Sequence, residues 1–263
     1  MANVLIVFAH AEPNSFNSQL LSAMVNGFTT QGDKVEVSDL YQMEFNPVAS
    51  ASDFKVRQDP TRLDYFAEQK HAWPAQALAD DIQAEIDKIA WCDLMVFQFP
   101  MYWFSLPAIL KGWVDRVFVP GFAFGSGKWY ERGGLVGKRA MLSFTMAAYP
   151  QMMARDGLNG LLDVHLWHIQ SGMLAFCGFD VLAPFVVNGV PYSQADERAA
   201  AIARLEARIA GLHQEAPRLF HRREEFDRSW KMNPEVAPRT VGHHFARFSD
   251  DELASVLGAA PQE

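Results

Sequence analysis

The fold is decided by the stretch Asp93-Leu94-Met95-Val96-Phe97-Gln98-Phe99-Pro100-Met101-Tyr102-Trp103-Phe104-Ser105-Leu106-Pro107-Ala108-Ile109-Leu110-Lys111-Gly112-Trp113. Its first eight residues are mostly apolar and end in a proline, which predicts a strand buried on both faces of a parallel sheet. Pro107 suits the start of a helix over about 107–118. Between them, Tyr102, Trp103 and Phe104 follow the end of the strand, where ligands bind in open α/β sheets. Exposing three rings is costly unless something flat covers them, so we expect a planar cofactor there.

The bulk composition is that of a globular protein, with 263 residues, 49% hydrophobic and 21% charged. A net charge of −8 disfavours nucleic acid and anionic membranes as general partners. Cys92 and Cys177 lack ligand spacing, which indicates buried thiols in a reducing compartment rather than a disulfide or a zinc site. The N-terminal apolar run is too short for a signal or a membrane span, so we expect a cytoplasmic protein.

Five apolar or alternating segments predict strands, and helical spacing returns between them. The remaining strands are expected over 4–9, 34–40, 138–145 and 179–187, and the remaining helices over 16–30, 75–91, 161–176 and 193–214. This alternation predicts a doubly wound, flavodoxin-like α/β sheet, with the ligand at the switch point between the first and third strands. We expect residues 1–216 to form this domain and 217–263 to form an arm over the core or a partner subunit.

Two further loops belong to the expected site. Ser15 is placed to cap the helix over 16–30, so free backbone N–H groups, the Ser15 hydroxyl and the Asn17 amide would favour an anion there. A plain capped helix is an equally common interpretation, and no glycine occurs in residues 1–26 to make a glycine-rich fingerprint. The loop 146–150, at the end of the fourth strand, should face the aromatic loop across the site.

Other segments leave alternatives open. Residues 42–78 are either an insertion with short helices or a lid-like loop. The glycines and phenylalanines of 120–127 indicate a pocket wall, a subunit contact or a plug on the core. His165 and His168 share a helix near Asp163, but without a third ligand we expect no metal site. A hydrogen-bonded structural role is also expected for the pair His243-His244.

Taken together, the motifs resemble the NAD(P)H:quinone oxidoreductases of the DT-diaphorase type over nearly the whole chain. The matching segments are Ala9-His10, Ser15-Phe16-Asn17, 97–100 with 103–104 and 107–113, Ile169-Gln170-Ser171-Gly172, Phe176-Cys177-Gly178-Phe179 and Val241-Gly242-His243-His244. The resemblance implies a flavodoxin-fold homodimer that holds FAD, with FMN as the less expected cofactor. It also implies that a hydride passes from NADPH or NADH to flavin, and then to a quinone, in a ping-pong cycle.

Position by position, the resemblance also implies a set of cofactor contacts. The pyrophosphate and ribityl region would lie against His10, Ser15, Phe16 and Asn17. The flavin ring would lie against Pro100, Met101, Tyr102, Trp103 and Phe104 on one side and Thr145, Met146, Ala147 and Ala148 on the other. The adenosine end would lie near Asp64 and Arg198, and Asp115 matches an acidic position on the following helix. Trp103 and Phe104 would form the catalytic floor.

The acceptor slot departs from the family pattern. The resemblance implies that Phe124, from the partner subunit, and Phe176 wall the slot, with Ser126 where the family has a tyrosine. Met153 and Asn159 stand where the family carries a tyrosine and a histidine that relieve charge on the reduced flavin, and neither exchanges a proton near neutral pH. Tyr149 is the candidate catalytic replacement. The family's Thr-Thr-Gly-Gly is 145–148 here, without the glycines.

Three functions therefore compete. The leading one is an FAD-dependent NAD(P)H reductase of quinones. A reductase of azo, nitroaromatic or other xenobiotic acceptors is the alternative within the enzyme class. A non-catalytic regulatory or electron-carrier flavoprotein is the alternative outside it, because the family's proton-exchanging pair is absent.

Overall fold

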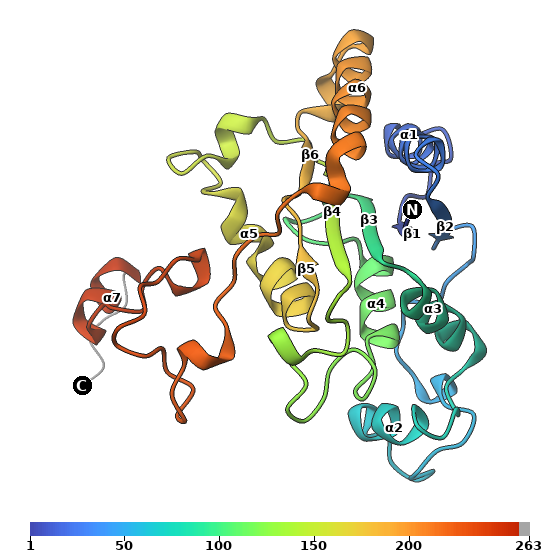
Figure 1. The fold of residues 1–263 in the computed structure, drawn as a ribbon, viewed down its shortest axis with the longest axis vertical. Coiled ribbons are helices and arrows are strands. Elements are labelled where there is room, and N and C mark those ends of the chain that lie inside the picture. The colour runs from blue at the N-terminus through green and yellow to red at the C-terminus, as the bar shows by residue number, and fades with distance from the viewer. Residues whose placement is uncertain (258–263) are drawn as a thin grey trace.

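The computed structural model describes residues 1–257 and is built on one parallel sheet in the order β2-β1-β3-β4-β5, with β6 also paired to β4. The strands are β1 (Asn3–Phe8), β2 (Lys34–Asp39), β3 (Leu94–Pro100), β4 (Arg139–Thr145), β5 (Asp180–Val181) and β6 (Phe185–Val187). The helices are α1 (Phe16–Thr30), α2 (Tyr65–Ala72), α3 (Asp80–Trp91), α4 (Ala108–Val117), α5 (Leu162–Ile169), α6 (Ala195–Gly211) and α7 (Asp250–Leu257). The predicted doubly wound, flavodoxin-like architecture is confirmed (Figure 1).

Both faces of the sheet carry a hydrophobic core. Alternate residues of β1 and β3 point to opposite faces, so Leu5 and Phe97 belong to the core beneath α3 and α4. Ile6 and Val96 belong to the core beneath α1 and α6. Every residue of β3 is buried, which confirms the prediction of a central strand covered on both sides. Helices on both faces leave the loops at the strand ends as the places where a ligand can reach the sheet.

The predicted fifth strand, 179–187, is wrong as a single element. It is divided into β5 and β6, each of which pairs with a different part of β4. Pro184 lies in the gap, and because proline has no N–H it cannot donate to a ladder. On both sides of this gap the chain runs parallel to β4, so the parallel order of the sheet is preserved.

Three helix predictions also need correction. Residues 75–79 are not helical, because Leu78 pairs with Phe54 in an isolated antiparallel bridge, and α3 begins at Asp80. The helix predicted over 161–176 is α5 followed by a π-helical turn, Gln170–Ala175. Ser193 is not the cap of α6. Gln194 is, while the Ser193 hydroxyl donates to the Val190 carbonyl.

Residues 217–257 follow α6 and add no strand to the sheet described for residues 1–257 (Figure 1). They contact the rest of the chain at several points, among them Trp167, whose ring lies 6.1 Å from Phe220 and 5.7 Å from His243. A Cβ added to Gly242 would lie 2.0 Å from Trp167, so only glycine allows this approach. We use the name arm for residues 217–257 below.

The two cysteines are free and buried. Burial raises the pKa of Cys92 to about 11 and that of Cys177 to about 12. Both are therefore protonated thiols at neutral pH, and the prediction that they are buried and unpaired is confirmed. Among the described residues, none of the helices has the length and apolar character needed to cross a bilayer.

A buried ion pair joins α4 to the segment before α2. Arg116 donates to Asp53 through Nη2 (2.9 Å) and Nε (3.1 Å), and to Asp81 through Nη1 (2.7 Å). The side chains of Arg116 and Asp53 are 4% and 1% exposed. The long insertion 42–78 is thus fixed to the core at this point.

We expect Arg116→Leu to lower the free energy of unfolding by about 3–5 kcal/mol, because Asp53 would be left as an uncompensated buried charge. Urea denaturation followed by circular dichroism measures this. The matched control on the same helix is Lys111→Leu, which removes an exposed ion pair with Asp115 and should cost less than about 1 kcal/mol. Equal losses in the two variants would contradict the argument.

Candidate functional site

The aromatic loop after β3 is a tight two-residue turn. The backbone N–H of Tyr102 donates to the Ser105 carbonyl (3.1 Å), and Ser105 donates back to Tyr102 (2.9 Å). Trp103 and Phe104, the two residues between, have φ of 49° and 59°. Turns of this geometry normally use asparagine or glycine, so two bulky rings here store backbone strain of a kind found at functional sites. Trp103 is 95% exposed.

Two histidines of α5 hold this loop. The imidazole of His165 stacks on the ring of Phe104, with centroids 4.8 Å apart, and its Nε2 lies 2.6 Å from the Asn159 carbonyl oxygen. The Nε2 of His168 lies 2.9 Å from the Ser105 hydroxyl. Burial lowers the pKa of His168, so that side chain is neutral at pH 7. From the sequence only a metal role was weighed for this pair, and no metal site was expected; the contact with the aromatic loop was not predicted, although the three-residue spacing places both histidines on one helix face.

The loop after β4 faces the aromatic loop, as predicted. The N–H of Met101 donates to the Thr145 carbonyl at 2.8 Å, which joins the two loops at their base. Together they line a cavity of about 210 Å³, the ring pocket, formed by Met101, Trp103, Phe104, Met146, Ala147, Ala148, Met153 and Asn159. Met153 and Asn159 contact each other in it, with Asn159 Nδ2 3.5 Å from the Met153 sulfur.

Backbone donors are available on both sides of the ring pocket. The N–H groups of Trp103 and Phe104, and those of Ala147 and Ala148, make no hydrogen bond to any residue among 1–257. The second loop is held in place by its neighbours, because Met146 donates to the Val187 carbonyl (2.9 Å). The pocket therefore combines an aromatic face with main-chain donors at its edges, an arrangement that suits a flat heterocycle.

A buried chain of side-chain hydrogen bonds supports this pocket from below. Ser143 donates to Gln98 (2.7 Å), Gln98 donates to Asn17 (2.7 Å), and Asn17 donates to Thr145 (3.0 Å). All four side chains are buried. The Asn17 amide is thus committed to the interior, contrary to the expectation that it faces an anion. It positions the start of α1 relative to the end of β4 instead.

The start of α1 provides the expected anion-binding geometry through its backbone. Ser15 is the N-cap and accepts from the N–H of Ser18, as predicted. The N–H groups of Phe16 and Asn17 have no acceptor within the described residues, and the first turn of α1 carries no acidic side chain. Free N–H groups at a helix N-terminus attract an anion. His10 lies before this turn, where its Nδ1 accepts from the N–H of Glu12 (3.0 Å).

A second cavity, of about 580 Å³, is lined in part by Tyr149 and Pro150 after β4 and shares no lining residue with the ring pocket. Tyr149, the residue after Ala148, lines this cavity and stacks on Tyr192 with centroids 5.7 Å apart. Tyr149 is not among the residues that line the ring pocket, where a replacement for the family tyrosine was expected. Arg198 also lines the second cavity, and its guanidinium lies 5.9 Å from the Phe16 ring centre.

Several expected site residues lie elsewhere in the chain. Phe124 and Phe176 are neighbours, with centroids 5.7 Å apart, and they line a third cavity of about 630 Å³ together with Ser126. That cavity shares no lining residue with the ring pocket. Asp64 caps α2, which lies far from α6 (Figure 1). Asp115 is paired with Lys111 on the surface of α4.

Among the described residues there is no cluster of three or more histidine, cysteine, aspartate or glutamate side chains placed to hold a metal ion. His165 and His168 are instead engaged with the aromatic loop, and Pro100 ends β3 beneath it. The two loops line a pocket whose shape and donors suit a planar group.

A family model described as having a flavodoxin-like fold matches residues 2–209. The NAD(P)H dehydrogenase [quinone] 1 of Cavia porcellus is 36% identical over 260 residues, covering 94% of both chains. The chain belongs to the flavodoxin-like quinone oxidoreductase family. The ribosyldihydronicotinamide dehydrogenase [quinone] of Mus musculus is 44% identical over 215 residues, covering 81% of this chain and 93% of its own. A solved structure from Klebsiella pneumoniae, described as a putative quinone reductase, superposes with a TM-score of 0.88 at 36% identity, covering 92% of this chain and 98% of its own.

We expect Gln98→Met to lower the free energy of unfolding by about 2–4 kcal/mol, because it leaves the Ser143 hydroxyl and the Asn17 oxygen buried without partners. Urea denaturation measures the loss. The matched control is Gln83→Met on α3, which removes an exposed hydrogen bond to Asp87 and should change stability by less than about 0.5 kcal/mol. An unchanged free energy of unfolding in Gln98→Met would mean that the buried chain of hydrogen bonds does not position the loops.

Proposed function

We propose that the protein is an FAD-dependent NAD(P)H oxidoreductase that reduces quinones by two electrons in a ping-pong cycle. The observation that carries the proposal is the ring pocket, which is lined by the strained aromatic residues Trp103 and Phe104 and by Ala147 and Ala148, whose backbone N–H groups have no acceptor among the described residues. Family membership and the names of the relatives support the quinone as acceptor. A location in the cytoplasm is proposed with it, consistent with the two free thiols.

The residues present fit a flavin. A bound flavin supplies reversible hydride acceptance, and the chain supplies its surroundings. Trp103 and Phe104 would cover the ring, and the N–H groups of Ala147 and Ala148 would donate to its polar edge. Because these contacts come from the main chain, the missing glycines of this loop do not remove them. The N–H groups at the start of α1 would hold the pyrophosphate.

FAD rather than FMN is favoured by the second cavity. A ring pocket and a helix N-terminus alone would serve FMN, whereas the 580 Å³ cavity with Arg198 gives space for an adenosine. Tyr149 and Tyr192 add exposed aromatic surface there, on which an adenine can stack. Heat-released cofactor identified by chromatography decides between the two, and release of FMN would refute this part of the proposal.

The arm supports NAD(P)H as the donor. Alignment to the Mus musculus relative, named for ribosyldihydronicotinamide, leaves about the length of the arm unmatched. Alignment to the Cavia porcellus relative, named for NAD(P)H, covers 94% of this chain. The family model itself ends at residue 209. The greater share of this chain covered by the relative named for NAD(P)H supports NAD(P)H as the donor.

The positions of Phe124 and Phe176 support a homodimer with composite sites. They lie together, and neither lines the ring pocket of its own subunit. If they wall the acceptor slot, both must reach it from the second copy. This revises the expectation that only Phe124 crosses between subunits.

An electron-carrier role is the second candidate, because Met153 and Asn159 bring no proton-exchanging group to the ring pocket. Anaerobic mixing of the yellow protein with NADPH or NADH separates the two. For the enzyme we expect flavin absorbance to bleach within seconds or faster, and to recover on addition of benzoquinone. Absence of bleaching by both nucleotides, with reduction only by a protein donor, would establish the carrier and refute the enzyme.

A complementation experiment tests the composite site. We expect Trp103→Ala and Phe176→Ala to be nearly inactive as separate proteins. Co-expressed, they should recover about a quarter of wild-type activity, since random pairing makes half of the dimers mixed and each mixed dimer has one intact site. Co-expression of Trp103→Ala with Phe104→Ala is the matched control and should recover nothing. Lack of recovery in both pairs would contradict the proposed dimer site.

A further inference from the structure

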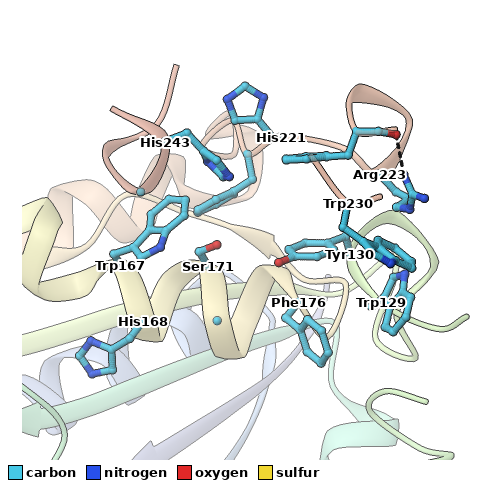
Figure 2. Close-up of a pocket in the computed structure, with 14 residues that line it drawn as sticks. Trp129, Tyr130, Trp167, His168, Ser171, Phe176, His221, Arg223, Trp230 and His243 are labelled. Atoms are coloured by element: carbon cyan, nitrogen blue, oxygen red, sulfur yellow. Dashed lines mark hydrogen bonds between the residues drawn. The ribbon is translucent and has the colours of Figure 1, made fainter. Parts of the chain in front are cut away.

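The helix α5 has two faces that contact different parts of the molecule. Figure 2 shows Trp167 pointing toward the arm, whereas His168 points to the opposite side of the helix. His165 lies three residues before His168 and therefore shares its face. The helix is fixed to the core by Leu166 and Ile169, which are both buried. It is thus a firmly packed support for the two histidines.

The imidazole of His165 contacts two separate segments that line the ring pocket. Its face stacks on the ring of Phe104, with centroids 4.8 Å apart and an angle of 24° between the planes. Its Nε2 lies 2.6 Å from the carbonyl oxygen of Asn159. A carbonyl oxygen only accepts hydrogen bonds, so this nitrogen carries a proton and donates. Phe104 and Asn159 both line the ring pocket, and one side chain therefore joins them.

The segment 150–160 depends on this hydrogen bond for its attachment. The N–H of Asn159 donates to the Met152 carbonyl (2.9 Å), and the N–H of Gly160 donates to the Gly157 carbonyl (3.0 Å). Such local bonds fix the shape of a loop but not its place on the protein. Among residues 1–257, the bond from His165 is the one described hydrogen bond that ties this segment to a neighbouring element.

The aromatic turn uses the same imidazole in a different way. The positive φ angles of Trp103 and Phe104 disfavour this turn, and Phe104 is 42% exposed. The stack of His165 covers one face of its ring. His168 adds a hydrogen bond to Ser105 but makes none to segment 150–160 within the described chain. His165 is thus the histidine that contacts both segments.

We propose that His165 is a positioning residue for the reaction: its imidazole holds Phe104 and Asn159 in a fixed relation and thereby sets the shape of the ring pocket. The proposal rests on the proposed function, since it takes the group held there to be a flavin. His165 does not line the pocket and acts through these two residues. A ring in a pocket of fixed shape keeps one orientation toward the acceptor, and losing that orientation slows the chemical step more than it weakens binding.

Three variants separate the two contacts of the imidazole. His165→Phe can keep the stack but lacks the N–H, His165→Gln can keep an N–H donor but lacks the ring, and His165→Ala lacks both. Hydrogen exchange of the purified full-length protein, resolved by peptide, measures how readily each segment opens. We expect exchange to be at least about threefold faster in residues 150–160 of His165→Phe, and in residues 101–106 of His165→Gln, because each variant loses one contact. His165→Ala should accelerate exchange in both segments.

Two neighbours on α5 provide matched controls. Val164→Ala changes an exposed side chain beside His165 and should leave exchange in both segments as in the wild type. His168→Ala removes the hydrogen bond to Ser105 and should accelerate exchange in residues 101–106 alone.

Two measurements on the flavin-loaded protein distinguish positioning from support of the fold. The circular dichroism of bound flavin at visible wavelengths reports its orientation, and we expect a weaker signal in His165→Ala. We also expect kcat with benzoquinone to fall about tenfold in this variant, while KM changes less than about threefold. His165→Phe and His165→Gln should each recover part of both losses, and Val164→Ala should match the wild type.

Three results would overturn the proposal. Unchanged exchange of both segments in His165→Ala would do so whatever group the protein binds. Equal acceleration of both segments in all three variants would mean that α5 itself is destabilised. Faster exchange with unchanged flavin dichroism and unchanged kcat would leave His165 with a structural role only. Purification of a protein without any flavin would instead refute the proposed function, while the exchange pattern would still decide whether His165 joins the two segments.

Discussion

The buried amide of Gln98 is the interaction on which both ends of the candidate site depend. It accepts from Ser143 on the neighbouring strand and donates to Asn17 on α1, which in turn donates to Thr145. Strand register makes this possible, because Gln98 lies opposite Ser143 and Pro100 opposite Thr145 in the parallel pair. A shift by one residue would turn Gln98 to the other face of the sheet. The anion end and the ring end of the site are thereby fixed to each other before any ligand arrives.

The aromatic loop depends on a different support. Positive φ angles at Trp103 and Phe104 disfavour the observed turn, and side chains of that size are unusual there. Two contacts from α5 compensate: the stack of His165 on Phe104 and the hydrogen bond between His168 and Ser105. Since α5 also contacts the arm through Trp167, the loop, the helix and the arm form one connected unit. The strained backbone of this loop is retained because the surrounding packing stabilises the structure by more than the strain costs.

Much of the fold could be predicted from sequence, because strong local signals determine it. The apolar run 93–100 and the cap Ser15 are such signals, and both occur as expected. The broken fifth strand and the late start of α3 could not be predicted in the same way. They depend on Pro184 within an apolar run and on a bridge between Leu78 and a distant residue. Neither pairing can be deduced from the period of hydrophobic residues alone.

For the site, residue types located the two loops but not the direction of individual side chains. Asn17 was expected to face an anion, and burial directs it inward, because its neighbours on β3 and β4 are polar and need partners. Tyr149 was expected in the ring pocket, whereas its ring stacks on Tyr192, which is distant in sequence. In each case a long-range contact decides the outcome. The aromatic loop was predicted correctly because its three rings are consecutive and need no long-range information.

The free N–H groups of residues 103–104, 147–148 and 16–17 have a consequence for the divergence of such proteins. A ligand held by main-chain atoms places little demand on the side chains that carry them. Methionine and alanine can then replace other residues at 146–148 while the geometry of recognition is kept, provided the strands beneath hold the loop in place. The sequence of the binding loops can therefore vary more than that of the buried polar chain beneath them. The most informative sequence signature of this site is accordingly its buried hydrogen-bonded residues, and not the residues that line the pocket.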